Sequence, residues 1–277
     1  MPVGCEVVER AGYGSFSEVW KIRDITTGKL FALKQLLPEW KDKPVAKRIL
    51  NIDAQVGIRV QGEHVVRIID DGAVNDRAFL IMEWLEGVSL EQKLQNERRL
   101  PESSAVWIAR QCAQGLLELG QAGFSHGDLK PQNIFVSSNG NIKLIDLGFA
   151  KPLGKSDECF TGKLLTGTAE YMAPESLSSE KHNPSAKDIY SLGITLFRML
   201  AGRLPFTADN SADILKMQKQ SRPPRLLRFC PTATRQLTQL VNRMLAKQPI
   251  RRPTNLSLLV RELIDLELQT LPERFGS

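Results

Sequence analysis

Cysteine is scarce in this sequence, and the few cysteines lie far apart. There are four in 277 residues, with no Cys-x-x-Cys pair, so neither a disulfide framework nor a structural zinc site is expected. Isolated thiols fit the reducing environment of the cytoplasm, which is where we expect the protein to work. The cysteines are Cys5, Cys112, Cys159 and Cys230.

Long apolar runs are also missing. The longest, residues 189–202, is interrupted by Arg198, and the N-terminal residues include glutamates where a signal peptide needs an apolar core. We therefore expect a soluble chain without a membrane segment.

Charge of one sign is not concentrated along the chain. The formal net charge is +6, but lysine and arginine are spread out, so nucleic acid is not an expected partner. The densest basic cluster combines Arg222, Arg225 and Arg228 with two intervening prolines. This cluster is either a solvated loop or a binding patch.

The composition that remains is that of a globular protein, with 42% hydrophobic and 25% charged residues. Residues 3–36 alternate β-prone runs with turn signals, which predicts three strands. Residues 43–60 carry apolar side chains at spacings of three and four, which predicts a helix. Two more strands are expected over residues 65–72 and 78–85, so the N-terminal portion is rich in strands.

From Ser89 onward the pattern becomes helical. Ser103 or Ser104, after Pro101, is expected to cap a long helix. Asn139 and Gly140 predict a hairpin inserted between helices. Further helices are expected over residues 89–95, 188–200, 212–220, 233–246 and 255–268.

The segment GYGSFS, residues 12–17, lies between two predicted strands. Glycines in such a hairpin let backbone N–H groups approach phosphate oxygens, and Val19 just beyond is placed to lie on an adenine face. An ordinary hairpin turn explains the same residues. Lys34 follows on a strand that also holds Ala32 and Leu33, and a lysine in a buried strand needs a partner, which phosphate oxygens would supply.

The segment HGDLKPQN, residues 126–133, is the most specific in the chain. Asp128 is expected to accept or orient a hydroxyl proton, Lys130 to neutralise a transferring phosphoryl group, and Asn133 to hold a metal. We interpret His126 as a core histidine. Asp146, in the DLG segment beyond the hairpin, would be a second metal ligand, because Mg²⁺ prefers hard oxygen donors and shares them with phosphates.

These motifs together resemble the eukaryotic-type protein kinase family over nearly the whole chain. FALK stands where the family has VAIK, HGDLKPQN where it has HRDLKPEN, and DLG where it has DFG. GTAEYMAPE matches the family's peptide-binding and APE segment, and DIYSLG and PIRRP follow in order. The resemblance implies a buried ion pair between Glu175 and Arg252, and Asp188 bracing the catalytic loop. Lys130 and Thr168 are similar to the serine/threonine branch.

The resemblance also implies an α+β, two-lobed fold in a single domain spanning residues 1–277, with an N-lobe over about 1–84, a hinge over about 83–88 and a C-lobe over about 89–277. The implied activity is transfer of the ATP γ-phosphoryl group to Ser or Thr hydroxyls of protein substrates. The implied cofactors are ATP and Mg²⁺, with Mn²⁺ as a substitute.

The nucleotide site follows from the same resemblance. Met82 would be the gatekeeper of the adenine pocket, residues 83–85 the hinge that reads adenine, and Phe135 the pocket floor. The expected nucleotide-binding residues are Ala11, Gly12, Tyr13, Gly14, Ser15, Phe16, Val19, Ala32, Lys34, Met82, Glu83, Leu85 and Phe135.

Two departures from the family pattern concern the loop glycines and the activation segment. Ser17 replaces the third loop glycine, and activity is expected to survive this change. Gly127 replaces the arginine that receives an activation-segment phosphate in the family. We therefore expect a non-RD enzyme whose activity does not depend on phosphorylation of Ser156, Thr161 or Thr166.

The partner of Lys34 is a third departure. The family uses a glutamate on the N-lobe helix, and the spacing places Asp53 there, with Glu63 and Asp42 as alternatives. Gly57 then occupies the place of a bulky spine residue. Because the aspartate side chain is one methylene shorter, either the helix packs closer or the ion pair is stretched. Either the helix is loosely docked and awaits a separate regulatory protein, or the register differs and Glu63 or Asp42 compensates.

Two rival functions remain. Gly127 also fits a small-molecule phosphotransferase, because antibiotic and choline kinases use an HGD-type loop. The changes at positions 53, 57 and 127 also fit a pseudokinase that acts as a binding scaffold, although Lys34 and Asp128 are retained.

Overall fold

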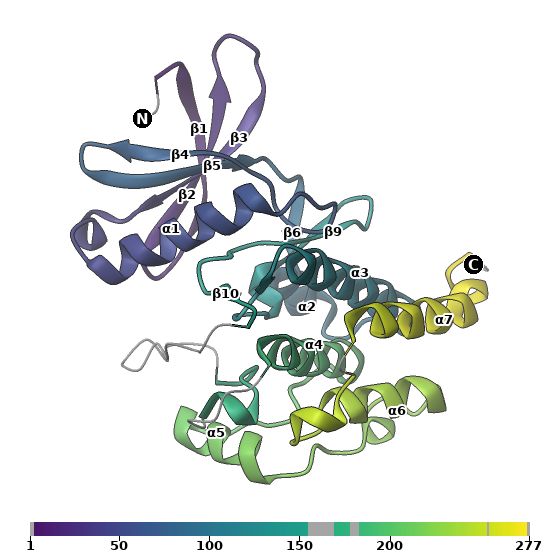
Figure 1. Ribbon diagram of the computed structural model, residues 1–277. Coiled ribbons are helices and arrows are strands. Elements are labelled where there is room, and N and C mark those ends of the chain that lie inside the picture. The colour runs from purple at the N-terminus through teal and green to yellow at the C-terminus, as the bar shows by residue number, and fades with distance from the viewer. Residues whose placement is uncertain (1–2, 155–168, 178–182, 254, 276–277) are drawn as a thin grey trace.

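The computed structural model describes residues 3–154, 169–177, 183–253 and 255–275. Figure 1 shows two lobes, a small one built on a β-sheet and a larger one built mainly of helices. This arrangement confirms the expected α+β, two-lobed fold. Among the described residues, no helix combines the length and the apolar character needed to span a bilayer.

The N-lobe sheet is antiparallel, and its five strands lie in the order β1-β2-β3-β5-β4. Asn75 and Asp76 have positive φ angles of 49° and 62°, which is the geometry of a two-residue hairpin between β4 and β5. The strands are β1 (Cys5–Tyr13), β2 (Ser17–Asp24), β3 (Leu30–Leu36), β4 (Ile68–Val74) and β5 (Arg77–Glu83).

Strand β4 begins three residues later than the pattern over 65–72 predicts. Val65 and Val66 are buried, but they pair with Leu144 of the C-lobe, whose carbonyl accepts a hydrogen bond of 2.9 Å from the Val66 N–H. An apolar run therefore forms a contact between lobes here and not a sheet strand.

The N-lobe helix α1 (Pro44–Arg59) packs on β3, β4 and β5. Pro44 is its first residue, a position where the missing proline N–H costs nothing. One face of the helix is buried, and it includes Ile49, Asp53 and Gly57. The burial of a carboxylate on that face places Asp53 inside the molecule, where it needs a partner.

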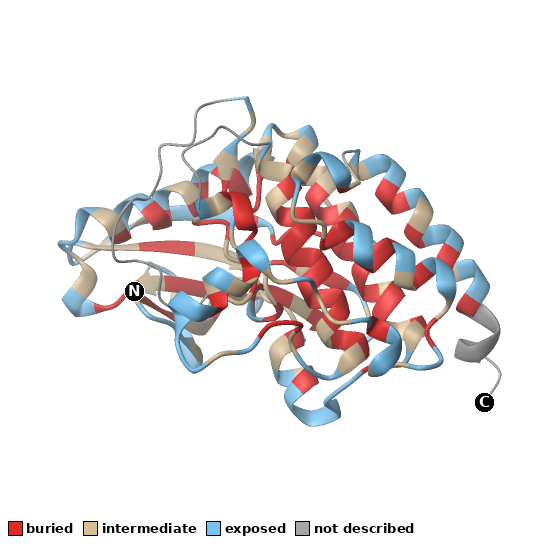
Figure 2. Ribbon diagram, turned by 90° about the horizontal axis from the view of Figure 1, so that it is seen from below, coloured by how far each residue is buried: buried red, intermediate tan, exposed pale blue. Residues whose placement is uncertain are grey.

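The C-lobe is built around α3 and α4, which pack against each other, with α7 lying along α3 and α6 against α4. Figure 2 shows buried residues concentrated in these central helices. The helices are α2 (Leu90–Glu97), α3 (Glu102–Gln121), α4 (Pro184–Ala201), α5 (Ser211–Gln220), α6 (Arg235–Met244) and α7 (Leu256–Phe275). Short 3-10 turns are η1 (Pro38–Trp40), η2 (Pro131–Asn133), η3 (Pro174–Leu177), η4 (Leu226–Arg228) and η5 (Pro249–Arg251).

The expected serine cap of α3 is wrong. Pro101 occupies the N-cap position in an extended conformation, and the helix begins at Glu102. Ser103 and Ser104 therefore lie in the first turn, because the proline already sets the entry of the chain into the helix.

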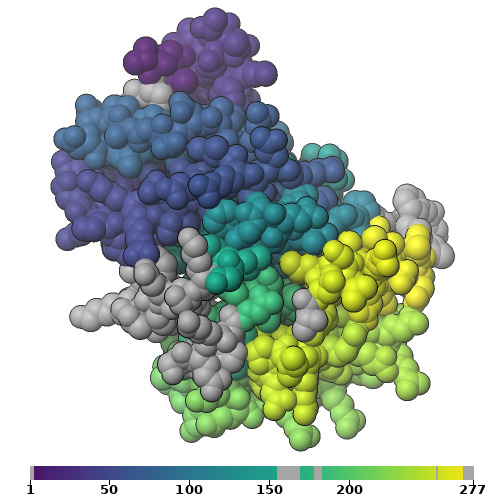
Figure 3. All heavy atoms as spheres, viewed as in Figure 1, coloured from purple at the N-terminus to yellow at the C-terminus, as the bar shows by residue number. Residues whose placement is uncertain are grey.

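Small strands hold the segments that follow α3. They are β6 (Gly87–Ser89), β7 (Phe124–Ser125), β8 (Ile134–Ser137), β9 (Ile142–Leu144) and β10 (Lys151–Pro152). The sheet β6-β8-β9 contains the predicted hairpin, with Gly140 at a φ of 83° in its turn. In the space-filling view the purple-to-blue N-lobe rests directly on the teal segments that begin the C-lobe (Figure 3).

Candidate active site

The glycine hairpin joins β1 and β2 and covers one side of the candidate nucleotide site. Gly12 pairs with Val19 across the strands, and the Gly14 N–H donates to the Ser17 carbonyl at 2.7 Å. Phe16 packs edge-on against Trp40, with ring centroids 6.5 Å apart. Ala11, Tyr13 and Ser15 belong to the same hairpin, which brings the predicted residues 11–19 together.

The predicted adenine side is formed by β3, β5 and the chain that follows β5. Ala32 of β3 pairs with Met82 of β5 and is buried. The N–H and C=O of Leu85 form no backbone hydrogen bond within the described part of the chain, so both remain available to a ligand edge. Phe135 of β8 lies beside Gly87 at the end of this segment.

Unlike Leu85, two residues further on, Glu83 has both its N–H and its carboxylate in contacts with other residues. Its N–H donates to the Arg67 carbonyl at 3.1 Å, and its carboxylate accepts from the Arg67 N–H and the Lys143 ammonium, each at 2.8 Å. Its side chain therefore stabilises the chain after β5, and adenine recognition would fall mainly to Leu85.

Lys34 lies between two carboxylates. Its Nζ is 2.6 Å from Asp53 Oδ2 and 2.9 Å from Asp146 Oδ1. Burial alone would lower the pKa of Lys34, but the charges of Asp146 and Asp53 outweigh burial and raise it. Burial opposes ionisation of Asp146, yet Lys34 keeps its pKa below the ordinary value. Lys34 is therefore a fixed cation.

Asp53 also binds the segment that carries the DLG motif. Its Oδ1 accepts a hydrogen bond of 3.0 Å from the Leu147 N–H. A Cβ atom on Gly148 would lie 2.4 Å from Ile49 Cγ2 of α1. Helix α1 is thus docked closely on residues 146–148, and Asp53 makes both contacts despite its short side chain.

Gly57, one turn after Asp53, lies directly against β4. A Cβ atom on Gly57 would lie 2.1 Å from Ile68 Cγ1. Ile68 therefore fills the space that a bulky residue at position 57 would need. The pairing shows why the missing side chain does not leave a hole, and it matches the closely packed helix that the sequence offered as one alternative.

The catalytic-loop residues predicted from HGDLKPQN gather around Asp128. Lys130 Nζ lies 2.7 Å from Asp128 Oδ2, and Asn133 Nδ2 donates to the Asp128 carbonyl at 2.8 Å and to its Oδ2 at 3.1 Å. Burial raises the pKa of Asp128, while the Lys130 charge opposes the rise. The Lys130 amine and the Asn133 amide thus both contact the Asp128 carboxylate.

Asp188 of α4 braces this loop from below, as the resemblance implies. Its two oxygens accept the N–H groups of His126 and Gly127 at 2.7 and 2.9 Å. His126 is fully buried, with Nε2 3.2 Å from the Ile145 carbonyl and Nδ1 accepting from the Asp128 N–H at 3.3 Å. The interpretation of His126 as a core histidine is confirmed.

Gly127 is held in a conformation that disfavours a side chain. Its φ is 79°, and a Cβ atom would lie 2.2 Å from the Phe149 carbonyl oxygen. Asp146 also has a positive φ, 63°, which points to backbone strain at the site.

The residues expected to hold a divalent cation fit that role. Asn133 uses its amide nitrogen for Asp128, and Asp146 uses Oδ1 for Lys34, so within the described residues Asn133 Oδ1 and Asp146 Oδ2 accept no hydrogen bond. The described residues contain no cluster of three or more His, Cys, Asp or Glu side chains able to hold a metal. Asn133 Oδ1 and Asp146 Oδ2 fit Mg²⁺, which takes one or two protein oxygens and shares substrate phosphates.

Several contacts at the site were not predicted from the sequence. They are the Asp146–Lys34 ion pair, the hydrogen bond from Leu147 to Asp53, and Ile68 against Gly57. Each joins residues distant in the chain and has no local signal. Ser156, Thr161, Thr166 and Thr168 lie outside the described residues.

The ion pair between Glu175 and Arg252 is confirmed. Two guanidinium nitrogens of Arg252 contact the two Glu175 oxygens at 2.6 and 2.7 Å. Both side chains are almost fully buried. Arg252 also donates to the Ala186 carbonyl at 2.8 Å, so the pair ties the segment before α4 to the segment before α7.

Comparison with known proteins agrees with this geometry. Residues 5–264 match the family model described as the protein kinase domain. The chain is 35% identical over 247 residues to "Serine/threonine-protein kinases PknA" of Corynebacterium glutamicum, covering 87% of this chain and 51% of that protein. It is 33% identical over 267 residues to "Serine/threonine-protein kinases drp72" of Corynebacterium efficiens, covering 94% and 50%.

A more distant relative is "Serine/threonine-protein kinase PknL" of Mycobacterium tuberculosis, 28% identical over 239 residues, which cover 86% of this chain and 59% of that protein. The chain thus spans about half the length of these two Corynebacterium relatives. With the family model matching residues 5–264, the chain belongs to the protein kinase domain family.

Proposed function

We propose that this chain transfers the γ-phosphoryl group of ATP to Ser or Thr hydroxyls of protein substrates. The observation that carries the proposal is the convergence of Lys34, Asp146 and the Asp128 cluster on one site between the lobes. A scaffold protein has no need of a fixed cation beside a low-pKa carboxylate and a second, base-like carboxylate.

Each residue has a role that follows from its position. Lys34 would bind phosphate oxygens as a permanent cation, held in place by Asp53. Asp128 would orient the attacking hydroxyl and accept its proton, and Lys130 would neutralise charge on the transferring group. Asn133 and Asp146 would hold Mg²⁺ or Mn²⁺, which neutralises phosphate charge when bound.

The nucleotide would lie under the glycine hairpin. Residues 11–16 would cover its phosphates, while Val19, Ala32 and Met82 would line the adenine side, with Phe135 as its floor. The free N–H and C=O of Leu85 support this orientation, because adenine presents a donor and an acceptor along one edge.

The direct test compares the wild-type chain with Asp128→Asn, which keeps the shape of the side chain and removes its basicity. We expect Mg²⁺-dependent labelling of a basic carrier protein from γ-labelled ATP in the wild type and a loss of roughly a hundredfold or more in the variant. Equal labelling by both proteins would refute the proposed kinase activity and would leave the function of a binding scaffold. Transfer to sugars or aminoglycosides alone would establish the small-molecule enzyme.

We further propose that phosphorylation of the activation segment is not required. Position 127 carries no side chain to receive a phosphate, and Asp188 holds the loop through its backbone N–H groups. Alanine at Thr161 or Thr166 should therefore leave turnover within about twofold of wild type. A protein that binds ATP but loses turnover after either change would show the opposite. We also propose that a separate regulatory protein controls the activity and that the chain works in the cytoplasm.

A further inference from the structure

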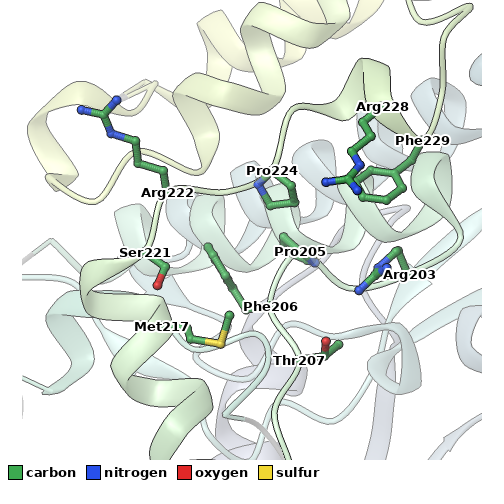
Figure 4. Close-up of a pocket in the computed structure, with 10 residues that line it drawn as sticks. All are labelled: Arg203, Pro205, Phe206, Thr207, Met217, Ser221, Arg222, Pro224, Arg228 and Phe229. Atoms are coloured by element: carbon green, nitrogen blue, oxygen red, sulfur yellow. The ribbon is translucent and has the colours of Figure 1, made fainter.

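A second cavity lies in the C-lobe, formed by elements that supply none of the phosphate or metal groups. Its volume is about 320 Å³, and it is lined by the chain between α4 and α5, the end of α5, and the chain that leads through η4. Its apolar lining, called the floor below, includes Phe206, Met217 and Phe229, and Figure 4 shows Arg203 and Arg228 beside Phe229. The pocket is large enough for an apolar side chain and its neighbours.

The pocket brings together two arginines that are 25 residues apart in the chain. The guanidinium groups of Arg203 and Arg228 lie 5.3 and 5.8 Å from the centroid of the Phe229 ring. Both side chains come from exposed positions. Figure 4 shows them on either side of this aromatic residue. An arginine stacked on an aromatic ring keeps its N–H donors free for an oxygen ligand.

The positive charges of Arg203 and Arg228 have no carboxylate partner among the described residues. Within the described part of the chain, neither arginine forms an ion pair, and none of the residues lining the pocket is acidic. Arg222 also lines the pocket, but its guanidinium points away from the other lining residues (Figure 4). Cations gathered without a counter-charge attract an anionic ligand.

Helix α5 connects this pocket with the segment predicted to bind peptide. Gln218 is buried next to Met217, and its side-chain amide donates to the Glu170 carbonyl at 2.6 Å. Glu170 lies in GTAEYMAPE. A ligand seated against the end of α5 therefore lies on the same helix that supports the substrate platform.

We propose that this basic pocket docks an acidic segment of a protein substrate, with an apolar side chain of that segment on the floor between Phe206 and Phe229. The identity of the partner as a substrate rests on the proposed kinase function; the binding itself does not. The charge of Arg203 and Arg228 selects carboxylates or phosphates on the segment, and the floor selects an apolar residue among them.

The binding test uses fluorescence anisotropy, without nucleotide, of a short labelled peptide in which aspartates and glutamates flank a central leucine. We expect saturable binding, weakened about tenfold or more by the double variant Arg203→Glu, Arg228→Glu. The control is Arg225→Glu, which makes the same kind of substitution once, in the loop that leads to Arg228, at an exposed position outside the pocket. It should change the affinity by about twofold or less.

Any of three results with the peptide would overturn the proposal. The first is no saturable binding, and the second is a loss of affinity in Arg225→Glu as large as that in the double variant. The third is that a peptide with serine in place of leucine binds as tightly as the original. Stronger binding to anionic phosphatidylserine vesicles than to the peptide, lost in the double variant, would also overturn it by assigning the pocket to a membrane surface. Unchanged thermal unfolding midpoints would show that the variants are folded.

A second measurement separates this proposal from the kinase function. With a substrate peptide extended by the acidic segment, the double variant should raise KM about tenfold and leave kcat unchanged. With the same substrate lacking the segment, wild type and variant should agree. A chain that binds the acidic peptide but transfers no phosphate would refute the kinase function and leave the docking site standing.

Discussion

Asp53 and Leu147 are joined by a hydrogen bond of 3.0 Å, although 94 residues separate them in the chain. The other oxygen of the same carboxylate contacts Lys34 at 2.6 Å. One short side chain therefore fixes the cation of the N-lobe relative to the segment that carries Asp146. Correct placement of these groups is the main requirement for phosphoryl transfer.

Asp53→Asn should reduce kcat about a hundredfold, because the amide loses the charge that holds Lys34 and misplaces a group that contacts phosphate. Steady-state kinetics with varied ATP would measure the effect. Asp42→Asn is the matched control, since Asp42 is exposed just before α1, and it should behave as wild type. Wild-type kcat in Asp53→Asn, or an equal loss in Asp42→Asn, would show that Asp53 does not position Lys34.

The pH dependence of turnover should report Asp128. The carboxylate must be ionised to accept a proton, and burial raises its pKa above the ordinary value of 3.8. Therefore kcat/KM should fall as pH decreases through that raised pKa. Lys130→Met removes the cation that lowers the pKa, so the acid limb should move to higher pH.

The measurement is a kcat/KM profile for both proteins over the range in which they stay folded. Lys93→Met in α2 provides a change of the same kind at a lysine whose ion pair is with Glu97 and not with Asp128, and it should leave the limb in place. An acid limb that moves to lower pH in Lys130→Met would contradict the assignment.

Arg252→Met should lower the free energy of unfolding by about 3–5 kcal/mol, because it leaves the Glu175 carboxylate buried without its partner. Urea denaturation would measure the loss. The neighbouring Arg251 is exposed, so Arg251→Met should cost about 0.5 kcal/mol or less. The double change Glu175→Gln, Arg252→Met should cost less than the sum of its parts; equal effects at positions 251 and 252 would rule out the pair as a stabilising element.

Gly57→Ala should destabilise the protein by about 1–3 kcal/mol, since the new Cβ overlaps Ile68. Gly120→Ala in α3 is the matched control, because its Cβ would make an ordinary contact of 3.7 Å with Leu256, and it should be neutral or stabilise by up to about 1 kcal/mol. Adding Ile68→Ala to Gly57→Ala should recover part of the loss. Thermal or urea unfolding would decide, and a stable Gly57→Ala protein would show that Ile68 moves aside at little cost.

Elements with strong periodicity could be predicted from the sequence. The spacing over residues 43–60 marks α1, and the turn residues Asn139 and Gly140 mark the hairpin between β8 and β9. The start of α3 could not be placed, because Pro101 and the following serines give competing signals and local geometry decides between them. The predicted start of β4 is too early, because the apolar residues Val65 and Val66 contact Leu144 of the C-lobe and do not belong to the strand.

In the candidate site, too, some features could be predicted from the sequence and others could not. Asp53 could be placed opposite Lys34 by the resemblance to the family, counting back from residues 64–70 to the position of the family's helix glutamate. How close α1 lies to β4 could not be predicted, because it depends on Ile68 filling the space beside Gly57. The sequence shows Arg228 within a basic cluster, but only the fold brings Arg203 to the same aromatic ring.

Within the described part of the chain, the N–H and C=O of Leu85 form no backbone hydrogen bond, and this has a consequence for the design of inhibitors. Because both groups belong to the backbone, substitution of the Leu85 side chain does not remove them, and only proline deletes the N–H. An inhibitor that bonds to these two groups and makes little use of neighbouring side chains would therefore leave few single-residue routes to resistance at this position.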